Sequence, residues 1–308
     1  MEDARIFCTD LAGLRAQALG LTEAAGLRAE LRTLRFRAPW HRISSGLWPV
    51  ARWAVGAEAF AGPMPGVVMG CGGAGARVAA ALRSKDVKAV AIQHPRMDLR
   101  KFDAILAARH DGIDGPNVIV TRTALHRVTQ ARLAAERMLW AEKFAAFRRP
   151  LVAVLLGGSN GRYRFEAPQA HALAAQLAAV AREAGLVITP SRRTAPEVVS
   201  ILRAALEPLG AWIWDMQGEN PYFGMLACAD AIIATADSVS MVSEAVATSA
   251  PVYLVRLPGR SARIGAFMDA LVQDGRVRDF AGRLELWDTA PLNDTEMAGA
   301  ELRRRLGL

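Results

Sequence analysis

Cysteine is scarce in this sequence. Only Cys8, Cys71 and Cys228 occur among 308 residues, and no two of them have the spacing of a zinc site or a redox pair. A small, odd number of cysteines is typical of a reducing compartment, so the sequence predicts a cytoplasmic protein. Long apolar runs are also missing: none approaches the roughly 20 residues that span a bilayer. The N-terminus has acidic residues and no apolar core, so it is not expected to be a signal peptide.

Metal-ligand spacings of His, Cys or carboxylates are absent as well, which predicts no metal and no resident cofactor. Gly70, Gly72 and Gly75 fit the pattern G-x-G-x-x-G. A dinucleotide site should open the fold and carry an acid at the end of the next strand. Here the glycines follow the third expected strand, and the next strand, 88–92, ends in Gln93-His94-Pro95-Arg96. A nicotinamide site is therefore rejected.

Positive charge, in contrast, is plentiful: the formal net charge is +8, which favours anionic partners. In residues 37–53, Trp40, Trp48 and Trp53 alternate with Arg37, Arg42 and Arg52. This mixture suits an anionic membrane surface, and predicts peripheral association with the inner face of a membrane. The alternative places the Trp rings in the core. Nucleic acid ranks lower because no nucleic-acid-binding module surrounds the segment.

Expected strands and helices alternate along the whole chain, which predicts an α/β fold with parallel sheets covered by helices. The long amphipathic helix at 131–147 is followed by Arg148-Arg149-Pro150, and a continuous apolar strand restarts at Leu151. We therefore expect two Rossmann-like, doubly wound domains facing a cleft, at 1–149 and 150–290. A C-terminal helix, within 291–308, is expected to pack back on the first domain.

Polar loops follow three strands of the second half and predict a ligand site, because carboxyl ends of parallel strands share one edge of a sheet. The loops contain hydroxyl groups, glycines and two adjacent arginines that suit a phosphate. The expected binding residues are Gly157, Gly158, Ser159, Arg162, Ser191, Arg192, Arg193, Thr194, Asn220, Tyr222, Asp237, Ser238, Ser240 and Glu244.

The segment 235–255 is central to this site. Asp237 and Ser238 stand where a helix is capped, and the free N–H groups at such a helix start suit a diphosphate. Glu244 lies about one turn further in, within reach of a ribose hydroxyl. The competing interpretation is an ordinary capped helix with a solvated Glu244.

A general base is sought in the first half, where polar residues follow several strands. Asp10, His94 and His110 each lie at or beyond an expected strand end and are the candidate catalytic residues. Each of them alone is more often a structural or surface residue. Asp10 in particular could simply cap the helix that follows it.

The pattern GGS…SRRT…NPY…TADSVSM-x-SEA…PVY resembles bacterial relatives of the plant mitochondrial-fission "elongated mitochondria" family. Looser motifs extend the resemblance to the first half, through Asp10, Gln17 and Pro95. The chain departs from the family at Leu11, where a glycine is usual. Such proteins are often labelled nucleoside-diphosphate-sugar epimerases. The label of an NAD-dependent epimerase does not fit this sequence. It lacks an early glycine fingerprint, and none of its three tyrosines begins a Tyr-x-x-x-Lys motif.

The segment SVSMVSEAVATSAPVYLV, residues 238–255, is similar to the donor-site helix of metal-independent GT-B glycosyltransferases. This resemblance implies that Ser238 and Ser240 meet phosphate, that Glu244 meets ribose, and that the sugar donor is a nucleotide-sugar. The first hypothesis is thus a nucleotide-sugar glycosyltransferase with a membrane-associated or lipid-linked acceptor. The second is a non-catalytic nucleotide-binding or recruitment protein on the same fold. The oligomeric state, the sugar and the acceptor are not specified by the sequence.

Overall fold

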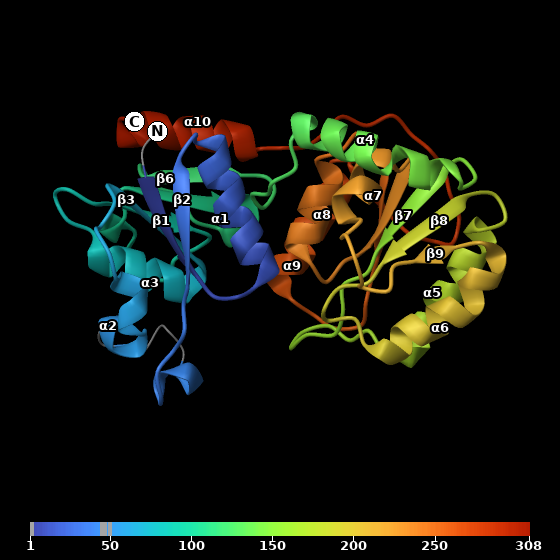
Figure 1. Ribbon diagram of the computed structural model, residues 1–308, viewed down its shortest axis with the longest axis horizontal. Helices are drawn as coiled ribbons and strands as arrows, with labels where there is room; N and C mark the ends of the chain where they lie inside the picture. The colour runs from blue at the N-terminus through green and yellow to red at the C-terminus, as the bar shows by residue number, and fades with distance from the viewer. Residues whose placement is uncertain (1–2, 44–47, 49–50) are drawn as a thin grey trace. The chain divides into compact units, whose positions relative to one another are not determined.

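The computed structural model describes residues 3–43, 48 and 51–308 (Figure 1). The chain divides into two compact units: unit 1 is Met1–Arg127 with Asn293–Leu308, and unit 2 is Val128–Leu292. Each unit has its own six-stranded sheet, and every strand pairing in both sheets is parallel. The predicted α/β fold class is confirmed.

Unit 1 has the strand order β2-β1-β3-β4-β5-β6. The chain passes from β1 to β2 on one side and then to β3 on the other, so the strand order reverses between β1 and β3. The strands are β1 Asp3–Cys8, β2 Arg28–Thr33, β3 Val67–Cys71, β4 Lys88–Ile92, β5 Ala104–Ala108 and β6 Val118–Thr121. The helices are α1 Ala12–Ala24, α2 Ala51–Ala54, α3 Gly72–Leu82 and α10 Thr295–Leu306.

Apolar side chains of β1 alternate between two cores, one on each face of this sheet. Ile6 packs in the core that contains α1 and α10, whereas Phe7 packs in the core that contains α3. Successive side chains of a strand point to opposite faces, so a buried parallel strand needs apolar residues at every position. This explains the continuous apolar composition of the central strands.

Unit 2 has the strand order β12-β11-β10-β7-β8-β9, which reverses between β7 and β10. The strands are β7 Leu151–Leu155, β8 Gly185–Thr189, β9 Trp212–Ile213, β10 Ala231–Thr235, β11 Val252–Val255 and β12 Val277–Asp279. The helices are α4 Gln130–Ala145, α5 Ala167–Val180, α6 Pro196–Leu206, α7 Tyr222–Cys228, α8 Val239–Val246 and α9 Ala262–Gln273. One core joins α4, α7, α8 and α9 to the sheet, and another joins α5 and α6.

Helix α4 packs in unit 2, although the sequence places it in the N-terminal domain, before the expected boundary at 149–150. Its Trp140 and Phe144 lie in the same core as β7. Gly224 of α7 makes this packing possible, because a Cβ there would lie 2.3 Å from the Trp140 ring. The C-terminal residues 293–308 belong to unit 1, where α10 packs against α1.

Candidate functional site

Three loops meet at the carboxyl edge of the unit 2 sheet, where the strand order reverses. They follow β7, β8 and β10, which are neighbours in the sheet. The Gly157 N–H donates to Thr235 Oγ1 at 2.7 Å, and the Ser191 hydroxyl donates to the Gly157 carbonyl at 3.0 Å. The Thr194 hydroxyl donates to the same carbonyl at 2.5 Å. The loops that the sequence proposed as one site are therefore directly hydrogen-bonded to one another.

Gly157 and Gly158 permit this close approach because they have no side chain. A Cβ on Gly157 would lie 2.1 Å from Asp237 Oδ1, and a Cβ on Gly158 would lie 2.0 Å from the Arg193 carbonyl oxygen. Both residues are buried. Any larger residue would push the loops apart.

Asp237 joins all three loops. Its fully buried carboxylate pairs with Arg193 Nη2 at 2.8 Å and accepts from Thr235 Oγ1 at 2.7 Å. The Gly158 N–H donates to it at 3.3 Å. Arg193 also donates to the Gly158 carbonyl at 3.0 Å. Asp237 thus connects the three loops through buried hydrogen bonds and an ion pair. Arg192, next to Arg193 in the chain, is exposed.

Helix α8 begins at this edge. Ser238 is its N-cap and accepts from the Met241 N–H at 3.3 Å, as the sequence suggested. Ser238 and Ser240 are half-buried. The helix start combines free backbone donors with a positive dipole end, a combination that favours an anion.

Glu244 lies inside α8 and is not a solvated charge. It is 8% exposed, and its Oε2 accepts a 2.5 Å hydrogen bond from the Tyr222 hydroxyl of α7. Burial raises the pKa of Glu244 to about 7, while the Tyr222 hydrogen bond and the charge of Arg132 act in the opposite direction. A buried carboxyl group that ionises near neutral pH, on the helix that begins at the three loops, is typical of a functional site.

The remaining predicted residues of unit 2 chiefly shape their own loops. The Ser159 hydroxyl accepts from the Phe165 N–H at 2.8 Å, and Asn220 Oδ1 accepts from the Tyr222 N–H at 3.0 Å. Arg162 Nη1 donates to Ser261 Oγ at 3.0 Å, which connects the loop after β7 to the start of α9. Sequence reasoning had not included this fourth loop, after β11.

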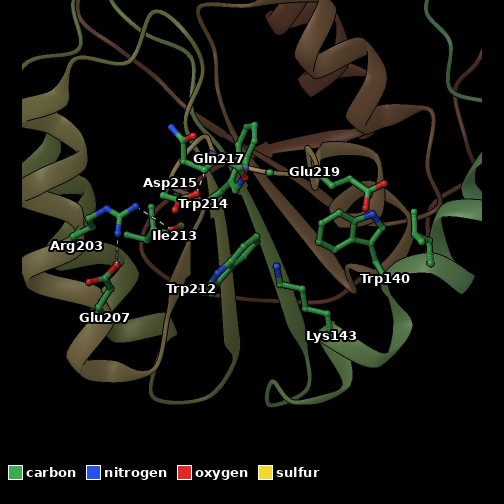
Figure 2. Close-up of a pocket in the computed structure, with 12 residues that line it drawn as sticks. Trp140, Lys143, Arg203, Glu207, Trp212, Ile213, Trp214, Asp215, Gln217 and Glu219 are labelled. Carbon is green, nitrogen blue, oxygen red and sulfur yellow. Dashed lines mark hydrogen bonds and ion pairs between the residues drawn. The ribbon is translucent and has the colours of Figure 1, made fainter.

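Two pockets differ in their relation to the three loops. The one of about 420 Å³ adjoins them, since Ala236, Tyr163, Arg260 and Ser261 line it. The larger, of about 620 Å³, lies beside the edge strand β9 and includes Trp212 (Figure 2). None of the predicted binding residues lines either pocket.

The candidate bases of unit 1 all follow strands of one sheet. Asp10 is exposed and pairs with Arg15 at 2.9 Å. His94 Nδ1 accepts from the Arg96 N–H at 3.0 Å, in a turn where Arg96 has a φ of 52°. His110 lies in a short 3-10 turn after β5. They therefore lie in three different loops at the carboxyl edge of the unit 1 sheet.

The glycines at 70–75 pack helix α3 against the sheet. A Cβ on Gly75 would lie 2.2 Å from the Phe7 carbonyl oxygen, and one on Gly70 would lie 2.2 Å from the Gly75 carbonyl oxygen. The third, Gly72, has a φ of +72°. The motif has a structural reason to be glycine-rich that involves no dinucleotide.

The Trp-Arg segment is only partly described, since 44–47, 49 and 50 and the side chain of Arg52 lie outside the described residues. Trp48 is buried and donates from its indole nitrogen to the Ile43 carbonyl at 3.1 Å. Trp53 is 60% exposed, Trp40 is half-buried, and Arg37 and Arg42 are exposed. The segment thus divides between core and surface.

Neither a membrane span nor a metal-binding cluster is found in the described part of the chain. No helix there is long and apolar enough to cross a bilayer. No group of three or more His, Cys, Asp or Glu side chains there is arranged to hold a metal ion.

Solved structures with a similar fold include a glycosyltransferase and an epimerase. A variant of Os79 from O. sativa in complex with UDP has a TM-score of 0.57 at 14% identity, covering 99% of this chain and 91% of that one. The glycosyltransferase SnogD from Streptomyces nogalater has 0.54 at 14%, covering 99% and 95%. The Methanocaldococcus jannaschii UDP-GlcNAc 2-epimerase in complex with UDP-GlcNAc and UDP has 0.55 at 12%, covering 100% and 99%. These similarities confirm the GT-B-like fold and do not select a reaction.

Sequence comparison identifies the family. Mitochondrial fission protein ELM1 of Arabidopsis thaliana is 36% identical over 276 residues, covering 79% of this chain and 64% of the plant protein, less than two thirds of its length. Uncharacterized protein RP120 of Rickettsia prowazekii is 28% identical over 254 residues, covering 69% of this chain and 71% of that protein. The family profile described as mitochondrial fission ELM1 matches residues 12–306. The chain therefore belongs to the mitochondrial fission ELM1 family.

Proposed function

We propose that this protein binds a nucleotide-sugar at the carboxyl edge of the unit 2 sheet and transfers the sugar without a metal ion. The observation that carries the proposal is the junction of three loops where the strand order reverses, with the start of α8 and the buried Glu244 beside it. Ligands of open α/β sheets bind at such a reversal. Structural neighbours described as complexes with UDP or UDP-GlcNAc support the same ligand class.

Each group at this edge has a proposed role. The start of α8, with Ser238 and Ser240, and the exposed Arg192 bind the diphosphate and stabilise its charge as it leaves. Glu244 accepts hydrogen bonds from the ribose hydroxyls. Asp237, Gly157 and Gly158 hold the three loops together.

The acceptor is proposed to bind unit 1. Asp10, His94 or His110 takes the proton from its attacking hydroxyl. The exposed Arg37, Arg42 and Trp53 support an acceptor at an anionic membrane surface, because cationic and aromatic side chains suit the headgroup region. We place the protein on the cytoplasmic side of that membrane.

Two experiments test this function. The first is a thermal-shift screen with nucleoside diphosphates and nucleotide-sugars, in which stabilisation by at least one is expected. The second incubates the protein with UDP-GlcNAc and anionic vesicles that carry a polyprenyl-linked sugar with free hydroxyl groups, and analyses the products. Release of UDP together with a glycosylated lipid supports transfer. A 2-epimer of the sugar nucleotide, or binding with no product, contradicts transfer and favours an epimerase or a recruitment protein.

A further inference from the structure

The contact between Tyr222 and Glu244 joins two helices at the proposed nucleotide site. Tyr222 is the first residue of α7, and its hydroxyl donates to Glu244 Oε2 at 2.5 Å. In the described part of the chain, no hydrogen bond is found to the other carboxylate oxygen, Oε1. Oε2 of the buried carboxylate is therefore hydrogen-bonded within the protein. Oε1 can accept hydrogen bonds from a ligand.

We propose that Tyr222 is a positioning residue of the nucleotide site: its hydroxyl fixes Glu244 through Oε2, so that Oε1 accepts the ribose hydroxyls. The inference rests on the proposed function. It adds a residue that acts through Glu244, and it makes nucleotide affinity depend on pH.

The pKa of Glu244 depends on the charged groups that lie near it. Arg132 of α4 lies over the Phe223 ring at 3.5 Å and pairs with Glu136 at 3.7 Å, and its positive charge favours the ionised form. At the two ends of α8, Asp237 pairs with Arg193, and Arg276 donates to the carbonyls of Val246 and Thr248. Hydrogen bonds from β10 and α9 to the Glu244 carboxylate are absent among the described residues. Tyr222 is therefore its hydrogen-bond donor in the described structure.

Removal of the Tyr222 hydroxyl has a predictable effect on ionisation. Burial holds the pKa of Glu244 at about 7, and the Tyr222 hydrogen bond lowers it from a still higher value. Tyr222→Phe should therefore raise this pKa and leave more Glu244 protonated at neutral pH. A protonated carboxyl is a weaker acceptor for ribose hydroxyls. A purely structural tyrosine would change stability without moving this midpoint.

The test is calorimetry of UDP-GlcNAc binding between pH 6 and 9, a range in which the diphosphate diester does not titrate. Wild-type affinity should increase as the pH rises through about 7. In Tyr222→Phe the midpoint should move up. A shift of one pH unit would lower the ionised fraction of Glu244 at pH 7 from about one half to about one eleventh, and would weaken binding there by about fivefold. Glu244→Gln should give a flat profile.

Tyr253→Phe is the matched control. It also loses a buried hydroxyl contact, to the Glu285 carbonyl at 2.6 Å, but on β11, and it should keep the wild-type profile. If Tyr222→Phe keeps the wild-type midpoint while Glu244→Gln is flat, the inference is overturned and the proposed function stands. If the wild-type protein does not bind UDP-GlcNAc at any pH, both fail.

A second measurement needs no ligand. The 13C resonance of the Glu244 carboxyl carbon, assigned by its loss in Glu244→Gln, reports ionisation directly. The positioning role requires an upward shift of its midpoint in Tyr222→Phe, and an unchanged midpoint overturns that role whether or not a nucleotide binds.

Discussion

At the scale of single residues, the loops of the unit 2 site pack so closely at some positions that only glycine fits there. Gly158→Ala would place a Cβ 2.0 Å from the Arg193 carbonyl oxygen, whereas Gly161, in the same loop, has no atom within 4 Å of its Cβ position. We expect Gly158→Ala to lower the free energy of unfolding by about 1–3 kcal/mol, as overpacking does. Gly161→Ala should change it by less than about 0.5 kcal/mol. Urea denaturation checks both, and equal midpoints would show that the loops separate freely.

Sequence reasoning found the residue types of this site but not their partners. A glycine pair, a hydroxyl-rich loop and an acid are visible in the sequence, and so are the strands that precede them. The contact of Asp237 with Arg193 spans 44 positions, and that of Tyr222 with Glu244 spans 22. Such contacts arise from the strand order, which local patterns do not determine. Glu244 was consequently placed in solvent or on a ribose, without the tyrosine.

At the scale of elements, the last helix completes the core of unit 1. Leu302 of α10 is fully buried in the core that also contains Leu21 of α1. Gly299 lets the helices approach, because its Cβ would lie 2.5 Å from the Ala24 carbonyl carbon. Asp294 fastens the start of α10 by accepting from the Arg122 N–H at 2.6 Å.

Leu302→Ala should therefore destabilise unit 1 by about 2–5 kcal/mol, the usual cost of a cavity. Amide hydrogen exchange should become faster in α1, β1 and β3 and stay unchanged in β7 and β10. The exposed Met297→Ala on the same helix is the control. Equal acceleration in both units would contradict the assignment of α10 to the unit 1 core.

The ends of the first elements of unit 1 do not follow from local sequence patterns. The apolar residues Leu31, Leu34 and Phe36 would by themselves predict a strand at 31–36, but β2 is Arg28–Thr33. Its register follows from pairing with β1, in which Asp3 lies opposite Arg28 and Arg5 bonds Glu30 at 2.8 Å. The first helix, α1, begins at Ala12, only two residues after Asp10. Edge strands and helix starts are fixed by neighbours that the local sequence does not reveal.

At the scale of the whole molecule, the two units should respond oppositely to acid. Burial lowers the pKa of His126 in unit 1 to about 4 from an ordinary 6.5. Between pH 7 and 5 the unfolded form of unit 1 therefore binds a proton that the folded form does not bind. Unit 1 loses stability over this range as a result. Burial raises the pKa of Glu244 to about 7 from 4.5, so folded unit 2 holds a proton that the unfolded unit has lost. Unit 2 therefore gains stability over the same range.

Each effect should amount to about 2 kcal/mol between pH 7 and 5. Hydrogen exchange corrected for intrinsic rates would resolve it by segment: β1 and β3 less protected at pH 5, and β7 and β10 more protected. His126→Gln should remove the first effect alone and Glu244→Gln the second alone. A parallel change in both units would contradict these protonation states.

The central claim is that a nucleotide-sugar binds unit 2 through Glu244, and calorimetry with UDP-GlcNAc at pH 8 tests it most directly. Glu244→Ala should weaken binding by about 1.5–3 kcal/mol, the contribution of hydrogen bonds to a charged group, without unfolding the chain. The exposed Glu142→Ala, in the same unit, should bind like the wild-type protein. Equal affinity of Glu244→Ala and Glu142→Ala for UDP-GlcNAc, or no binding by the wild-type protein, would contradict the claim.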